Sequence, residues 1–91
     1  MPWEREEQEH LLARIVTVPG VLGGKPIIRG MRISVELILS FLALGETMET
    51  LLDSYPDLER DDILACLEYA YRAIEGERFY PAIVEPEPVA R

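Results

Sequence analysis

The sequence predicts a mainly α-helical fold in which a bundle of three helices follows a short β element. Apolar residues recur at helical spacing in three segments after residue 34, and capping or helix-breaking residues bound each segment. The stretch before them is rich in β-branched residues and interrupted by glycine and proline, which favours short strands joined by turns. We expect an N-terminal helix before this core and an extended C-terminal segment after it.

The length and composition fit one small domain. A chain of 91 residues, 48% of them hydrophobic, has room for a single modest core. Because so short a chain buries only about 60–65% of its unfolded surface, we expect a partner to add stability, and a homodimer is one form of this. We divide the chain into an N-terminal polar helix over 1–13, a core over 14–76 and an extended or disordered tail over 77–91.

The first half of the chain supplies the polar helix and the strands. Residues 3–13 are rich in Glu and Leu and lack glycine and internal proline, so they favour a short helix. Residues 14–18 are β-branched and end at Pro19, and Ile27-Ile28 and Arg32-Ile33 flank Gly30. These features predict a small β element with turns.

The three core helices have clear boundaries. Ser34 is a suitable N-cap for an apolar helix over 35–44, buried on most sides, that ends before Gly45. Thr47 caps a second helix that Pro56 stops. The third begins near residue 59 or 60 and closes at Gly76. We expect its inward stripe to consist of Ile63, Leu67, Ala70 and Ile74.

Several classes of protein are excluded. Cys66 is the only cysteine, so the chain has neither an internal disulfide nor a zinc knuckle, and its place beside an apolar stripe predicts a buried, inert thiol. No apolar run is long enough to span a bilayer, and the first residues are acidic rather than signal-like. We therefore expect a cytoplasmic protein with no membrane partner.

The motifs that suggest cofactors are incomplete. Gly23-Gly24-Lys25 lacks the opening glycine and the Ser or Thr of a phosphate loop, so it is interpreted as a structural turn. The acids near residue 60 mimic calcium-loop spacing, but Asp62 stands where the loop needs glycine. Local spacing places no nucleophile beside a base. We expect no catalytic residue, no metal site and no cofactor, and hence no enzyme.

The charge distribution is uneven. The formal net charge is −8, yet residues 14–35 hold four basic residues and no acidic ones. This stretch is either a local contact for an anion or nucleic acid, or an internal partner for the acidic helices. The three core helices are also similar to a helix-turn-helix. We expect the outer face of the last helix to be mostly acidic and poorly suited to DNA, since it consists of Asp61, Ala65, Glu68, Arg72 and Glu75. The nucleic-acid candidates are therefore Lys25, Arg29 and Arg32.

A longer pattern resembles a known family. The run VPGVLGGKPIIRGMRISV over 18–35, the Gly45 turn, the YPDL break over 55–58 and the segment ILACLEYA resemble the bacterial domain of unknown function 433. The likeness covers about residues 14–71, and Met31 departs from the threonine usual in the family. It implies a helix-turn-helix or homeodomain-like fold. Some members look like antitoxins encoded beside a PIN-like nuclease, so the resemblance implies a toxin–antitoxin partner.

Two functions follow as alternatives. The first is an antitoxin-like, dimeric module that binds and neutralises a PIN-like ribonuclease toxin and weakly contacts its own operator DNA. Its partner-binding anchors are the apolar residues of the tail: Phe79, Tyr80, Ile83 and Val84. The alternative is a stand-alone helix-turn-helix transcriptional regulator that binds DNA through the basic stretch.

Overall fold

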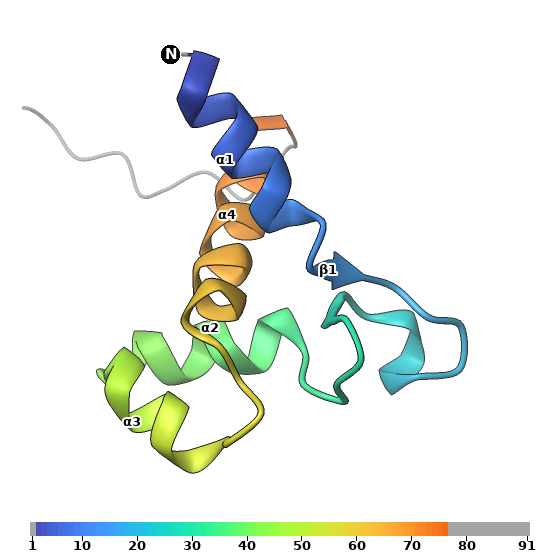
Figure 1. The fold of residues 1–91 in the computed structure, drawn as a ribbon. Coiled ribbons are helices and arrows are strands. Elements are labelled where there is room, and N and C mark those ends of the chain that lie inside the picture. The colour runs from blue at the N-terminus through green and yellow to red at the C-terminus, as the bar shows by residue number, and fades with distance from the viewer. Residues whose placement is uncertain (1, 77–91) are drawn as a thin grey trace, which may run out of the picture.

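Four helices and a two-stranded antiparallel sheet make up the part of the chain that this computed structural model describes, residues 2–76 (Figure 1). The mainly helical fold with a preceding β element is thus confirmed. In chain order the elements are α1 (Pro2–Leu12), β1 (Ile15–Val16), the 3₁₀ turn η1 (Leu22–Gly24), β2 (Ile27–Ile28), α2 (Val35–Ala43), α3 (Met48–Ser54) and α4 (Arg60–Gly76).

The β element is shorter than the sequence suggests. Ile15 pairs with Ile28 in the antiparallel ladder, and the Arg29 amide donates to the Arg14 carbonyl at 2.8 Å. A tight turn follows β2, with Gly30 at φ +78°, a left-handed conformation that glycine adopts without strain. This turn leads directly to the start of α2.

The caps of α2 and α3 are those that the sequence predicts. The Ser34 hydroxyl accepts a hydrogen bond from the Leu37 amide at 3.0 Å, and Thr47 accepts one from the Thr50 amide at 3.1 Å. Gly45 follows α2 with φ +95°, as a helix-ending glycine does. These local hydrogen bonds fix where both helices begin.

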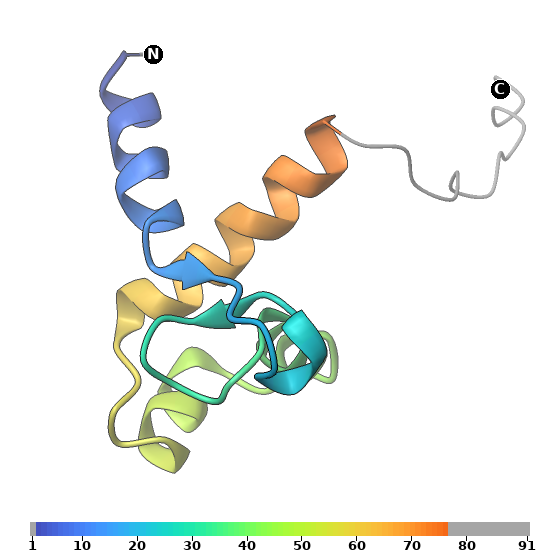
Figure 2. The same cartoon turned by 90° about the vertical axis from the view of Figure 1, so that its right-hand side faces the viewer.

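Helix α4 lies at the centre of the fold. It contacts α1, α2, α3 and β1, and Figure 2 shows it rising between α1 on one side and α2 and α3 below. The largest fully enclosed side chains are Ile28, Ile38, Ile63 and Cys66. The core is therefore built around the first half of α4.

The predicted inward stripe of α4 is wrong in its second half. Ile63 is enclosed, but Leu67 is 44% exposed and Ile74 65% exposed. Glu68 and Ala65, which we expected on the outer face, are buried. The reason is that α1 packs beside α4, so the buried surface of α4 turns toward α1.

Helix α2 is less enclosed than its composition suggests. Only Val35 and Ile38 are fully buried within it, and Leu44, directly after it, is 82% exposed. The expectation of burial on most sides is therefore wrong for this chain by itself. An apolar side of α2 stays open.

Candidate interaction surface

The basic stretch of residues 14–35 is partly neutralised inside the fold. Arg14 Nη1 lies 2.7 Å from Glu59 Oε1 and 3.0 Å from Asp62 Oδ1, and its Nη2 lies 3.8 Å from Asp61 Oδ2. These hydrogen bonds, the one to Glu59 foremost, raise the pKa of Arg14 above its ordinary value. Arg14 thus joins the start of β1 to the start of α4.

Asp62 is the most enclosed partner of this cluster. Its side chain is 7% exposed, and its second oxygen accepts a hydrogen bond from the Glu59 amide at 2.8 Å. A carboxylate that bonds back to the amide three residues earlier is half of a capping box, which satisfies a free amide at a helix start. The sequence signal for this contact is the pair of acids in the first turn of α4 together with the basic residue directly before β1.

Lys25, the first nucleic-acid candidate, also has an internal partner. Its Nζ lies 2.7 Å from Glu36 Oε1, and the pair links the turn after η1 to the first turn of α2. Both side chains are largely exposed, so the pair contributes little to stability. It does place a carboxylate beside the ammonium group, which disfavours a phosphate there.

Arg29 and Arg32, the other two candidates, stay exposed on either side of Gly30. Within residues 2–76 neither forms an ion pair. Arg29 lines a hollow of about 370 Å³ that it shares with Arg14 and with the carboxylates of Asp57, Glu59 and Asp62. The two exposed arginines thus lie three residues apart around Gly30, whereas Lys25 is paired with Glu36.

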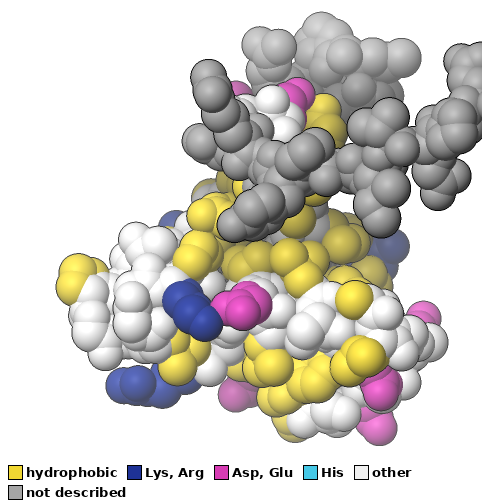
Figure 3. All heavy atoms as spheres, turned by 180° about the vertical axis from the view of Figure 1, so that it is seen from behind, with side chains coloured by type: hydrophobic (Ala, Val, Ile, Leu, Met, Phe, Trp, Pro, Cys, Tyr) yellow, Lys and Arg dark blue, Asp and Glu magenta, His cyan; other side chains and the backbone are white. Residues whose placement is uncertain are grey.

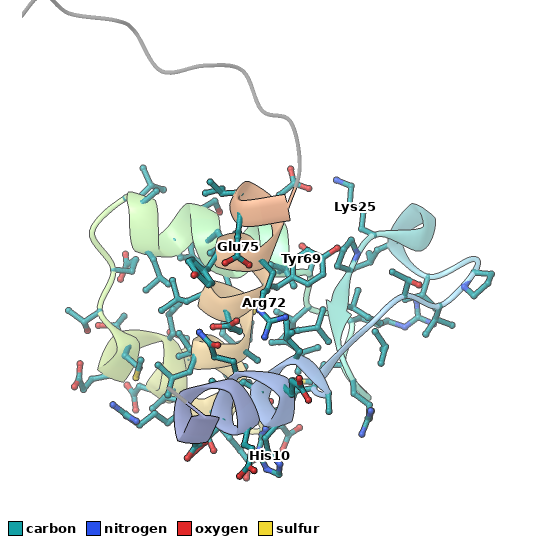
Figure 4. All side chains as sticks on the ribbon, turned by 90° about the horizontal axis from the view of Figure 1, so that it is seen from above. His10, Lys25, Tyr69, Arg72 and Glu75 are labelled. Carbon is teal, nitrogen blue, oxygen red and sulfur yellow. The ribbon has the colours of Figure 1, made fainter. Side chains whose placement is uncertain are left out.

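An apolar groove of about 640 Å³ lies between α2 and α4. Its walls include Val35, Leu39 and Ala43 on α2, and Tyr69, Ala73 and Ile74 on α4. Figure 3 shows apolar side chains gathered on this face. Lys25 and Glu36 lie at the edge of the groove. Figure 4 shows Lys25 and Tyr69 on the same side of α4, whereas Arg72 points toward α1. Sequence reasoning missed this groove because two distant helices form it. We call it the α2–α4 groove.

The second half of α4 carries two local polar pairs. Arg72 Nε donates to Glu68 Oε2 at 2.8 Å, the local pairing that the four-residue spacing predicts. The Tyr71 hydroxyl donates to Glu75 Oε2 at 3.0 Å, and this contact raises the pKa of Tyr71. With α1 against one side, α4 presents apolar and acidic groups outward.

Cys66 is buried, as the sequence predicts. It is fully enclosed, and desolvation, with a smaller contribution from the charge of Asp62, raises its pKa to about 12. Across residues 2–76, no three His, Cys, Asp or Glu side chains gather closely enough to hold a metal ion. Nor does any helix of this region combine the length and apolarity that crossing a bilayer requires.

The tail anchors Phe79, Tyr80, Ile83 and Val84 lie outside the described residues. The nearest described part of the chain is the C-terminal end of α4, at Gly76, which closes the helix where the sequence predicts. Ile74, two residues earlier, lines the α2–α4 groove. The described part of the chain therefore ends two residues after a residue of this groove.

Comparison with known proteins identifies the family of this chain and a solved structure with a similar fold. Residues 15–70 match the family described as protein of unknown function DUF433. The chain belongs to this family. The crystal structure of a DUF433 member from Anabaena variabilis is similar to this chain, with a TM-score of 0.66 and 30% identity, over 81% of this chain and 73% of that one.

A curated relative extends the comparison. The uncharacterized protein y4eO of Sinorhizobium fredii is 33% identical to the DUF433 chain over an alignment of 76 positions. The alignment covers 77% of this chain and 34% of that protein. The chain thus spans about a third of the length of this relative. The matched family region, residues 15–70, contains the β element, α2, α3 and most of α4.

Proposed function

We propose that this DUF433 chain is a non-catalytic binding module for another polypeptide. The observation that carries the proposal is the open α2–α4 groove, which is lined by Leu39 and Ala43 of α2 and by Ile74 of α4, and Ile74 is 65% exposed. Outside the groove, Leu44 after α2 and Leu67 of α4 are also 82% and 44% exposed. Contiguous exposed apolar surface on a small domain is typical of a protein interaction site. A chain this short also buries only about 60–65% of its unfolded surface by itself, which leaves room for a partner to add stability.

The partner class comes from the resemblance to antitoxin-like members. It is a PIN-like ribonuclease, which this chain would bind and neutralise as a homodimer. The net charge of −8 supports this choice, since a nuclease that binds anionic RNA offers a basic channel to an acidic inhibitor. Large apolar side chains supply most of the affinity at such interfaces. In this chain they are those of the tail: Phe79, Tyr80, Ile83 and Val84.

The test is reconstitution with a purified partner. The tagged chain is used to capture a PIN-like nuclease from its host cells, mass spectrometry identifies it, and its ribonuclease activity is then titrated with the pure chain. We expect activity to fall to background at a fixed molar ratio. A nuclease that remains fully active with excess chain contradicts the toxin assignment.

A pair of tail variants locates the contact. The variant with Phe79, Tyr80, Ile83 and Val84 all changed to Ser is expected to lose inhibition, because hot-spot side chains dominate binding energy. The matched control, Ala82→Ser with Val89→Ser, changes the same tail and keeps those four residues. Inhibition that persists in the first variant would move the contact to the folded core.

The second candidate function is operator binding, favoured by the exposed Arg29 and Arg32 beside Gly30. In this function the chain acts as a DNA-binding regulator from the turn before α2. The test is fluorescence anisotropy with DNA from upstream of its own gene, at several salt concentrations. Arg29→Ala with Arg32→Ala should weaken binding and reduce the salt slope by about 0.9 per lost phosphate contact. Lys25→Ala, which removes an ion-paired group, should have the smaller effect. Unchanged affinity in the double variant rejects this site.

A further inference from the structure

We propose that in the free protein the segment 77–91 folds back over the α2–α4 groove of its own chain. Its apolar side chains would then lie against the open walls of α2 and of the second half of α4. The side chains concerned are Phe79, Tyr80, Ile83 and Val84.

The first support is that α4 carries an apolar stripe that its neighbours do not finish covering. The stripe runs through Ile63, Leu67, Ala70 and Ile74 at helical spacing. Its first member is enclosed in the core, whereas Ala70 and Ile74 line the groove and Ile74 is 65% exposed. On the opposite wall, Leu39 of α2 is partly buried and Ala43 is exposed. Both walls are apolar and lack a cover among residues 2–76.

The second support is where the chain leaves the fold. α4 ends at Gly76, two residues after Ile74. Phe79 is three residues further on, within about 10 Å of Gly76 at about 3.3 Å per extended residue. The six residues 79–84 then span about 17–20 Å. The wall from Tyr69 to Ile74 is only about 7.5 Å long at 1.5 Å per helical residue. The segment is therefore long enough to turn back and follow the whole groove.

The third support is the local chemistry of the segment. Gly76 permits the chain to reverse direction at the helix end. Pro81 disfavours continuation of the helix and favours an extended path, in which apolar side chains can follow a groove. The groove edge carries both charges of the Lys25–Glu36 pair, and the segment likewise carries Arg78 among its acids.

The tether favours this occupant over a second copy. Only four residues, 75–78, separate Ile74 of the groove from Phe79. A segment tethered this closely is present at the groove at an effective concentration in the mM range. A second molecule must instead give up translational and rotational freedom, which costs several kcal/mol on any estimate. At low protein concentration the chain's own segment therefore binds first.

This inference goes beyond the proposed function, because it concerns the free protein and needs no nuclease. It has a consequence for that function, however. The same four side chains cannot occupy the groove and anchor a partner at once, so a partner that uses them must first displace the segment.

The test is nuclear magnetic resonance on the full-length chain. Aromatic rings shift the resonances of methyl groups stacked on them, so Phe79 and Tyr80 should give ring-current shifts of the Ala73 and Ile74 methyls and nuclear Overhauser contacts with them. We expect these contacts to persist on dilution. Phe79→Ser with Tyr80→Ser should abolish them while the methyl shifts of Ile38 and Ile63, in the core, stay in place. The control variant Ala82→Ser with Val89→Ser should keep them.

Two outcomes would overturn the inference. If the Ala73 and Ile74 methyl shifts are the same in wild type and in the Phe79→Ser, Tyr80→Ser variant, the segment does not occupy the groove. If the contacts appear only between isotope-labelled and unlabelled molecules mixed together, the occupant belongs to a second copy. Neither outcome depends on whether a nuclease partner exists, so this test and that of the proposed function fail separately.

Discussion

The Asp62 carboxylate binds two parts of the chain, the residue before β1 and the start of α4. One oxygen accepts from Arg14 at 3.0 Å and the other from the Glu59 amide at 2.8 Å, in a side chain that is 7% exposed. Asp61, its neighbour, is 49% exposed and lies 3.8 Å from the same guanidinium. Arg14 therefore forms an enclosed ion pair with Asp62 and an exposed, longer one with the neighbouring Asp61.

Asp62→Ala is expected to lower the free energy of unfolding by about 2 kcal/mol, since it leaves Arg14 without its enclosed partner and removes a helix cap. The cost stays below that of a fully buried pair because Arg14 is 28% exposed. Asp61→Ala is the control and should cost at most about 0.5 kcal/mol. Urea unfolding followed by circular dichroism measures both. Equal costs would show that enclosure of the Asp62 carboxylate adds nothing.

Cys66 makes stability depend on alkaline pH. Its pKa is raised to about 12 in the fold against 9.0 for a free thiol, so above pH 9 the unfolded chain releases a proton that the folded chain retains. This contribution is complete below pH 9 and is lost as the pH rises toward 12. We expect the urea midpoint to fall across that range, and Cys66→Ala to reduce the slope.

A second measurement isolates the thiol from Tyr71, whose pKa is also raised. Tyr71→Phe removes the tyrosine contribution and should leave a slope that Cys66 still causes. Ellman's reagent should react with the native chain only as fast as it unfolds, because the thiol is enclosed. Fast labelling of native protein at pH 8 would contradict the burial of Cys66.

At the scale of single helices, the start of α2 depends on one hydroxyl. Ser34 accepts from the Leu37 amide, whereas the Ser40 hydroxyl within the helix donates to the Leu37 carbonyl at 2.7 Å. The first bond satisfies an amide that has no helical partner, and the second duplicates a carbonyl bond of the helix. Ser34 therefore caps α2, whereas the Ser40 side chain satisfies no otherwise unpaired backbone group of the helix.

Ser34→Ala should therefore destabilise the protein by about 1 kcal/mol, the usual cost of a lost N-cap. Ser40→Ala serves as the control and should be neutral or slightly stabilising, since alanine is the better helix former. Thermal unfolding of both variants and of the wild type measures these differences in stability. A larger loss for Ser40→Ala would show that the cap geometry is not what holds α2.

The elements were predictable where their signals are local. The Ser34 and Thr47 caps, the Gly45 helix end and the start of α4 near residue 60 depend on residues a few positions apart. The exposed half of the α4 stripe was not predictable, because which side of α4 is buried depends on α1, about fifty residues earlier. The same holds for the Arg14–Asp62 pair and the α2–α4 groove. Periodicity identifies an apolar face but not the element that covers it.

At the scale of the whole molecule, the balance of charge is negative. The chain carries a formal charge of −8, and the described ion pairs involve only Arg14, Lys25 and Arg72 among its basic residues. Like charges that remain unpaired repel one another and oppose the compact state. Salt screens such exposed charges beyond about 10 Å at 0.1 M, and an enclosed pair such as Arg14–Asp62 much less.

We therefore expect added sodium chloride to stabilise the fold. A gain of up to about 1 kcal/mol between low and physiological ionic strength would raise Tm by about 4–8 °C in a domain of this size. Differential scanning calorimetry at a series of salt concentrations measures it, with sucrose at matched osmolality as the control. A fall in Tm with salt would mean that attraction within the ion pairs outweighs the repulsion.

The central place of α4 also bears on how the protein is made. Synthesis runs from the N-terminus, so α1, the β element, α2 and α3 leave the ribosome before the helix that contacts them all. Until codon 76 has been translated, their apolar residues have no common surface to pack on. A message cut short before α4 would therefore encode no smaller folded protein. We therefore expect the nascent chain to keep apolar side chains exposed until α4 has formed.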